Sequence, residues 1–132
     1  MPERSLTLTV EHLGPRALVV LPDLVDAASQ RSVGEQVLAA LDASGGSLII
    51  DMSDVTFIDS AGLGVLISAH RRARESGAGL AVVAEHPIVL YMLEIAGADQ
   101  LFTVYPSVHD ALYNDPAADP AADRPRAVRP AR

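Results

Sequence analysis

The stretch Ser47-Leu-Ile-Ile-Asp-Met-Ser-Asp-Val-Thr-Phe-Ile-Asp-Ser-Ala-Gly-Leu-Gly64 holds the two signals that decide the fold. Its first half is a short and very apolar run, which is typical of a strand buried in the centre of a sheet. Its second half places Asp59 and Ser60, two favoured helix-start residues, before apolar residues that recur at helical spacing. A buried strand followed by a helix is the repeating unit of an α/β protein.

The residues before this stretch also predict strands followed by a helix. Leu6–Val10 alternates apolar and polar residues, and Ala17–Leu21 is continuously apolar. The Gly14-Pro15 turn lies between them, so the two segments are expected to pair as a hairpin. Apolar residues at helical spacing follow Ser29, a candidate N-cap, and this helix is expected to end at Gly45-Gly46.

Downstream, the helix that begins at Asp59-Ser60 is expected to end near Gly77. The remaining expected elements are a strand at Leu80–Ala84, a helix from Pro87 to about Ala96, a strand at Leu101–Val104 and a helix from Pro106. The order β-β-α-β-α-β-α-β-α predicts a single α/β domain over residues 1–113. Its sheet is expected to be mixed and mostly parallel, with about five strands and about four helices. Residues 114–132 are rich in Pro, Ala and Arg and are expected to form a disordered tail.

Composition narrows the function classes. The 132 residues include no cysteine, which excludes disulfides, thiolate metal sites and cysteine nucleophiles. The formal net charge of −7 argues against binding to nucleic acid through its phosphates. No uncharged apolar run approaches about 18 residues, and no signal-peptide pattern is visible, so neither a membrane span nor export is expected. We expect a cytoplasmic protein without a metal or cofactor.

Ser60 has three chemical interpretations. A hydrolase nucleophile needs glycine at position 58, which is Ile58, and the four histidines that might serve as a base lie in no recognisable motif. A dinucleotide-binding turn needs glycine at position 67, which is Ile67, and the chain has no lysine for a phosphate-binding loop. The histidines are His12, His70, His86 and His109.

The third interpretation is a modifiable serine at a helix N-terminus. A strand-to-helix turn should expose the Ser60 hydroxyl, and Gly62 and Gly64 leave room beside it for the backbone of another protein. Free N–H groups and the helix dipole tolerate a phosphate at this place. Phosphorylation would add roughly −1.5 to −2 charges near Asp59 and would disturb a docked partner rather than the fold. Spacing alone leaves a plain N-cap equally open.

The stretch Leu48–Ile67 resembles the signature of STAS domains and, more narrowly, of anti-sigma factor antagonists. In that family an aliphatic strand ends in Asp, and Asp-Ser-(Ser/Thr/Ala)-Gly-Leu-Gly then opens a helix. The segments Pro87–Gly97 and Leu101–Val104 resemble the third helix and the last strand of the family. The matching motif residues are Asp51, Asp54, Asp59, Ser60, Gly62, Leu63 and Gly64.

The resemblance implies a regulatory protein rather than an enzyme. An anti-sigma factor that is itself a serine kinase would phosphorylate Ser60, and a PP2C-type phosphatase would reset it. The unphosphorylated form would bind that kinase and release the sigma factor, regulating transcription in a stress response or in development. The alternative is a STAS scaffold or ligand-sensing module without such a switch. The implied partner-binding residues on the helix start are Asp59, Ser60, Ala61, Gly62, Leu63 and Gly64.

One segment departs from the family pattern. The family has Gly-(Glu/Asp)-(Leu/Ile)-Asp after its second strand, whereas this chain has Leu21–Asp26, with Pro22 in place of the glycine and one extra residue. Asp23 and Asp26 are therefore both candidates for the acidic loop that the family places beside the phosphorylated serine.

Overall fold

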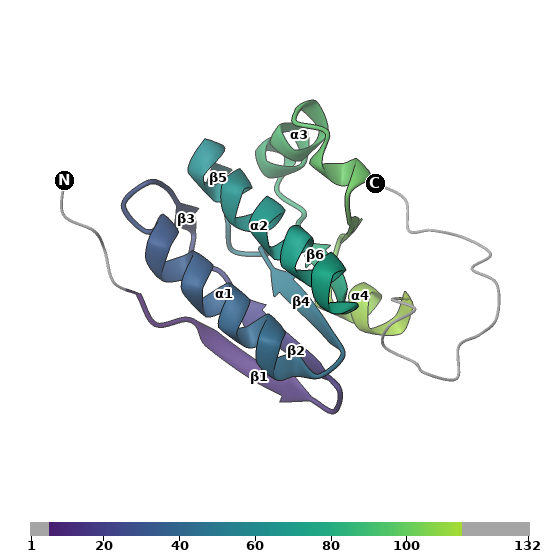
Figure 1. Ribbon diagram of the computed structural model, residues 1–132. Helices are drawn as coiled ribbons and strands as arrows, with labels where there is room; N and C mark the ends of the chain where they lie inside the picture. The colour runs from purple at the N-terminus through teal and green to yellow at the C-terminus, as the bar shows by residue number, and fades with distance from the viewer. Residues whose placement is uncertain (1–5, 115–132) are drawn as a thin grey trace.

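The structure is a computed structural model that describes residues 6–114 (Figure 1). In chain order the elements are β1 (Thr9–Leu13), β2 (Arg16–Val20), β3 (Leu24–Val25), α1 (Gln30–Ser44), β4 (Ser47–Asp51), β5 (Phe57–Ile58), α2 (Ser60–Ser76), β6 (Gly79–Val83), α3 (Pro87–Ile95), the 3-10 helix η1 (Ala98–Gln100), β7 (Thr103–Tyr105) and α4 (Val108–Asn114). The predicted order of the main strands and helices is confirmed.

The main sheet has five strands in the order β1-β2-β4-β6-β7. The β1–β2 hairpin is antiparallel, and every other neighbouring pair in this sheet is parallel. The apolar run of β4 lies in the centre, where Ile49 pairs with Leu18 of β2 and with Ala81 of β6. The structure thus confirms the mixed, mostly parallel sheet, and central burial explains why β4 is apolar on both faces.

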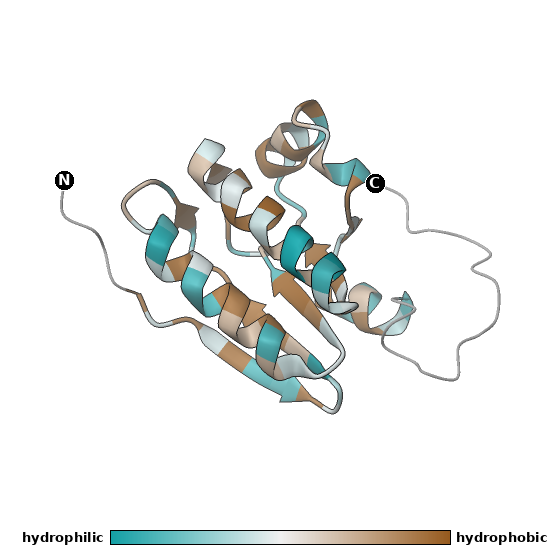
Figure 2. Cartoon of the chain, viewed as in Figure 1, coloured by the Kyte–Doolittle hydropathy of each residue, from teal (hydrophilic) through white to brown (hydrophobic). Residues whose placement is uncertain are grey.

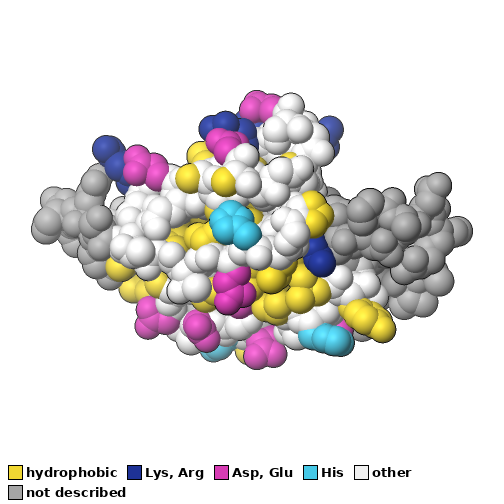
Figure 3. Space-filling view, turned by 90° about the horizontal axis from the view of Figure 1, so that it is seen from below, with side chains coloured by type: hydrophobic (Ala, Val, Ile, Leu, Met, Phe, Trp, Pro, Cys, Tyr) yellow, Lys and Arg dark blue, Asp and Glu magenta, His cyan; other side chains and the backbone are white. Residues whose placement is uncertain are grey.

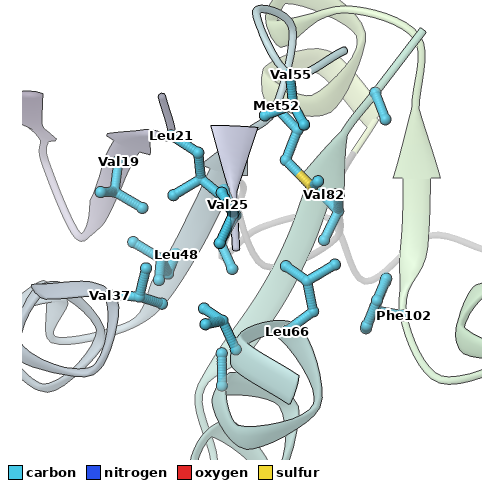
Figure 4. Close-up of a cluster of buried hydrophobic side chains, with 14 of the residues drawn as sticks. Val19, Leu21, Val25, Val37, Leu48, Met52, Val55, Leu66, Val82 and Phe102 are labelled. Atoms are coloured by element: carbon cyan, nitrogen blue, oxygen red, sulfur yellow. The ribbon is translucent and has the colours of Figure 1, made fainter. Parts of the chain in front are cut away.

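Helices cover the two faces of the sheet unequally. α1 and α2 lie side by side on one face, and α4 packs on the other face against β4, β6 and β7 (Figure 1). Hydrophilic residues mark the exposed side of α1 and the second half of α2, whereas α3 is largely hydrophobic (Figure 2). The larger core lies beneath α1 and α2 and joins Val37, Leu48 and Leu66, which Figure 4 shows converging. A smaller core beneath α4 contains Ile49 and Tyr105.

The first strand differs from its prediction. The alternating segment Leu6–Val10 was expected to pair, but the ladder covers Thr9–Leu13. Leu6 and Leu8 instead pack against the larger core from outside the ladder. Their backbone N–H groups donate hydrogen bonds to side chains of α1. The start of the alternating segment is therefore hydrogen-bonded to α1, and the edge strand β1 begins only at Thr9.

Two more strands lie outside the prediction. β3 and β5 have two residues each and form a separate parallel pair. Leu24 pairs with Phe57, and Val25 pairs with Ile58. Both belong to the connections that follow β2 and β4, so the small pair joins the loop after one strand to the start of α2.

Glycines end the two long helices as predicted. Gly45 after α1 and Gly77 after α2 both have left-handed backbone angles, with φ of 76° and 74°. Only glycine adopts this conformation without strain. Ser29 does occupy the N-cap position of α1, but its side chain makes no capping hydrogen bond. Its hydroxyl is instead bonded to Asp26.

The predicted domain boundary is only partly covered. α4 extends through Asn114, and the rest of the predicted tail lies outside the described residues, as do residues 1–5 of the predicted domain. None of the helices within residues 6–114 combines the length and the apolar character needed to cross a bilayer. Within the same range, no group of three or more acidic or histidine side chains is placed to hold a metal ion.

Candidate functional site

Ser60 is the first residue of α2, and its side chain is exposed. The preceding Asp59 is the N-cap, because its Oδ1 accepts hydrogen bonds from the N–H groups of Ala61 at 2.9 Å and Gly62 at 3.1 Å. The backbone carbonyl of Asp59 also accepts the first helical hydrogen bond, from Leu63. The cap that the sequence predicts is thus made by Asp59, and the Ser60 hydroxyl is not needed for it.

This cap changes one electrostatic expectation. A phosphate on Ser60 was expected to be tolerated through free N–H groups at the helix start. Two of those N–H groups are already bonded to the carboxylate of Asp59. The dipole of α2 and the solvent exposure of Ser60 remain favourable for a phosphate. The nearby charge of Asp59 opposes it.

The two glycines of the motif differ in their surroundings. Gly62 is buried, and a Cβ there would lie 2.5 Å from Ile58 Cγ1 and 3.1 Å from the carbonyl oxygen of Val25. The prediction that Gly62 leaves room for a partner's backbone is therefore wrong. A Cβ on Gly64 would lie 3.3 Å from Nε2 of Gln30, in a groove between α1 and α2.

The small pair of β3 and β5 brings the acidic loop to the start of α2. β2 continues its pairing only as far as Leu21, whose N–H donates to the carbonyl of Asp51 at 2.9 Å. Pro22 follows and has no N–H to continue the ladder. The chain then pairs with the segment before Ser60, where the N–H of Thr56 donates to the carbonyl of Asp23 at 3.1 Å. Two segments far apart in sequence thereby meet beside Ser60.

Asp23 and Asp26, the two loop candidates, have different surroundings. Asp26 is half-buried, and its Oδ1 accepts hydrogen bonds from the hydroxyl of Ser29 at 3.1 Å and from the N–H of Ser29 at 3.2 Å. The N–H of Asp26 donates back to the Ser29 hydroxyl at 3.1 Å. These bonds fix the turn into α1. Asp23 is exposed just before β3.

The geometry gives no support to Ser60 as a nucleophile. His70 packs edge-on against Phe102, with ring centroids 6.3 Å apart. His86 caps α3 by accepting the N–H of the second helical residue, and His109 stacks on a tyrosine of α4. In the part of the chain that the structure describes, no histidine is hydrogen-bonded to Ser60. A general base would have to lie within hydrogen-bond reach of it.

A phosphate-binding turn for nucleotides fits no better. Such a turn needs backbone N–H groups that point at the ligand and glycines that allow it to come close. Gly62 is covered by Ile58, and its N–H is bonded to Asp59. The helix start is therefore closed by the protein's own side chains, and the Ser60 side chain is the exposed chemical group.

Charge on the described surface is predominantly acidic. Residues 6–114 contain 13 Asp and Glu residues and 5 Arg residues, a net charge of −8. Figure 3 shows acidic side chains spread over one face, while the basic ones lie apart from each other. One exposed ion pair, between Arg72 and Asp42 at 3.3 Å, links α2 to α1 far from Ser60. Acidic charge is thus general, and it does not by itself mark the site.

Comparison with known proteins gives a consistent result. The family model described as STAS domain matches residues 8–111. An anti-sigma-F factor antagonist of Mycobacterium tuberculosis is 32% identical over 112 residues, which cover 82% of this chain and 88% of that protein. A putative anti-anti-sigma factor of the same organism is 26% identical over 114 residues, covering 84% and 76%.

Solved structures agree with these relatives. The crystal structure of an anti-sigma factor antagonist from Mycobacterium paratuberculosis has a TM-score of 0.73 and 26% identity, covering 86% of this chain and 94% of that one. The antagonist SpoIIAA in its unphosphorylated form has a TM-score of 0.67 at 14% identity, covering 80% and 93%. The second likeness shows the same fold.

Proposed function

Because the chain belongs to the STAS domain family of anti-sigma factor antagonists, we propose that it is such an antagonist and that Ser60 is its phosphorylation switch. In the unphosphorylated form it binds an anti-sigma factor that is a serine kinase, and the sigma factor is released. The kinase then phosphorylates Ser60 and the complex separates. A PP2C-type phosphatase restores the binding form, and the cycle takes place in the cytoplasm.

The proposal is supported by the exposed hydroxyl of Ser60. Asp59 caps α2, so the exposed hydroxyl of Ser60 has no structural task at the helix start. A serine kept there only as a cap would hold those N–H groups itself. The hydroxyl lies instead on the exposed first residue of the 17-residue helix α2, where a kinase can reach it. The mechanism needs no catalytic group on this chain, since the kinase brings the ATP.

A phosphate on Ser60 would act at the interface with the partner. It adds roughly −1.5 to −2 charges beside Asp59. Because Ser60 is exposed, the phosphate requires no rearrangement of the core. The kinase presents the phosphates of its own nucleotide to this point, so like charges would meet on both sides of the contact. The expected result is faster dissociation of an intact, folded antagonist.

Some of the predicted site residues are exposed and can contact a partner, whereas others hold the local structure beneath them. We propose that Ser60, Ala61 and Leu63 on the first turn of α2 contact the partner, together with Asp23 on the adjoining loop. Asp23 is the better candidate for the acidic position because its side chain is exposed, whereas Asp26 is bonded to Ser29. Asp26, Asp59 and Gly62 support this surface by holding the turn, the cap and the packing beneath it, and Gly64 lies on the next turn of α2, in the groove beside α1.

The proposal is tested by measuring the affinity of the purified kinase for wild type, Ser60→Ala and Ser60→Asp. Ser60→Ala is expected to bind and to resist phosphorylation. Ser60→Asp is expected to melt like wild type but to bind poorly. Ser68→Asp is a matched control, because Ser68 is also exposed on α2, about two turns further along. Equal affinity for all four proteins contradicts the switch.

A further inference from the structure

The short helix α3 is apolar on both of its faces. Val89 and Leu93 are buried against the core, at 0% and 1% exposure. On the other side, Ile88, Tyr91 and Ile95 are exposed by 48%, 58% and 59%. A helix that is hydrophobic all round is ordinarily buried all round. The outer side of α3 therefore has the character of a surface that another molecule covers.

The exposed residues of α3 lie on one face. Ile88, Tyr91 and Ile95 are separated by three and four positions, the spacing that aligns side chains along a helix. We call these three residues the α3 stripe. Glu94 is the one charged residue of α3 itself, and most of the helix is hydrophobic in Figure 2. Scattered exposed apolar side chains are ordinary, whereas neighbouring ones on a single helix face are a candidate interaction surface.

The α3 stripe is linked in space to the switch residue. α3 contacts β5, the two-residue strand that ends just before Asp59 and Ser60. Phe57 of β5 is 47% exposed. It therefore adds a fourth large apolar side chain on the segment that leads into α2. α3 lies beyond α2 as seen from α1 (Figure 1), so this surface is separate from the groove between α1 and α2.

We propose that the α3 stripe and Phe57 form an apolar docking surface for the same anti-sigma factor that reads Ser60. This inference rests on the proposed function, since it extends the contact from the helix start across β5 to α3. The partner is expected to present an apolar patch bordered by Lys and Arg. Tyr91 is the central anchor, because a large aromatic side chain in the middle of a stripe gives the strongest contact.

Charge around the surface favours a basic partner. The acidic residues Asp54, Asp59, Glu85 and Glu94 lie on or beside the segments that carry the surface. Residues 52–59 and 84–101 contain no Arg or Lys, and the nearest arginines in the sequence, Arg71, Arg72 and Arg74, lie in the second half of α2. A second copy of this chain would fit poorly. Symmetric pairing through α3 places the same acidic border on both sides, and like charges facing each other oppose association.

The test compares Tyr91→Ser and Ile95→Ser with Tyr113→Ser, using the purified anti-sigma factor kinase as the probe. Tyr113 is 79% exposed on α4, on the other face of the sheet, and is the matched control. Each stripe variant is expected to weaken binding about tenfold, and Tyr113→Ser to leave it unchanged. All three side chains are exposed, so melting temperatures should stay close to wild type. If all three variants bind the kinase as tightly as the wild-type protein does, the inference is overturned.

Including Ser60→Asp in the series separates this inference from the proposed function. Weak binding by Ser60→Asp with normal binding by both stripe variants would retain the switch and reject the α3 surface. Weak binding by the stripe variants with normal binding by Ser60→Asp would retain the surface and reject the switch. Analytical ultracentrifugation measures the oligomeric state of the wild-type protein and of Tyr91→Ser. A wild-type dimer that becomes a monomer in Tyr91→Ser would assign the α3 stripe to a second copy of this chain and overturn the inference.

Discussion

Replacing Gly62 by alanine tests whether this motif glycine serves the fold or the partner. The new Cβ would lie 2.5 Å from Ile58 Cγ1, 3.2 Å from Ile58 Cδ1 and 3.1 Å from the carbonyl oxygen of Val25. Ile58 is 1% exposed, and Val25 belongs to the β3–β5 pair. Neither neighbour can move freely, so the substitution forces either a new side-chain rotamer or a shift of the backbone.

The magnitude follows from two opposing terms. Adding a methyl group to a tightly packed site costs about 1–3 kcal/mol. Replacing glycine by alanine within a helix returns at most about 1 kcal/mol. We therefore expect Gly62→Ala to lower the free energy of unfolding by about 1–2 kcal/mol. In a domain of this size, that loss lowers the melting temperature by roughly 4 °C for each kcal/mol.

Gly64→Ala is the matched control one half-turn further along the same helix. Its Cβ would meet only Nε2 of Gln30, at 3.3 Å, which is the far end of a flexible side chain. We expect this variant to be as stable as wild type or more stable by up to about 1 kcal/mol. Urea unfolding followed by circular dichroism measures both. Full stability of Gly62→Ala, or an equal loss in Gly64→Ala, would refute the packing argument.

Three further substitutions test the cap, the loop and the core by thermal and urea unfolding. Asp59→Ala should cost about 1 kcal/mol by removing the cap of α2, whereas Ser60→Ala should cost little; the reverse order would show that Ser60 makes the cap. Ser29→Ala should cost about 1–3 kcal/mol, because it leaves the half-buried Asp26 without its hydroxyl partner; an unchanged midpoint would contradict that role. Leu66→Ala should cost about 2–5 kcal/mol, because Leu66 is fully buried in the larger core; a smaller loss would mean that α2 packs loosely.

Much of the fold was predictable because its strongest elements carry local signals. The apolar run of β4, the Asp59-Ser60 pair and the glycines after α1 and α2 each identify an element by themselves. The β3–β5 pair was missed because two-residue strands show no periodicity. The shift of β1 to Thr9–Leu13 was missed because alternation records which side chains are buried and does not show what buries them.

The sequence predicts where the site around Ser60 lies, but it does not predict what each residue of the site does. The sequence identifies Ser60 at a helix start, and only the structure shows that Asp59 makes the cap there. Asp23 and Asp26 look alike in sequence, and hydrogen bonding to Ser29 distinguishes them. Gly62 was expected to face a partner because the sequence does not show that its open side is turned inward, against Ile58 and the backbone of Val25.

The exposed face of α3 cannot be read from the sequence. Ile88, Tyr91 and Ile95 recur at helical spacing, but so do the buried Val89 and Leu93 on the same short helix. A nine-residue helix that is apolar throughout does not reveal which face meets the core. Only the packing of Val89 and Leu93 into the larger core separates the two faces.

The central claim is that Ser60 is the residue whose phosphorylation controls partner binding. Mass spectrometry of the protein isolated from its own cells, in the free state and in complex with the anti-sigma factor, tests this most directly. We predict a phosphate on Ser60 and on no other serine in the free fraction, and unmodified Ser60 in the complex. A phosphate on another residue, or equal phosphorylation of Ser60 in both fractions, would contradict the account.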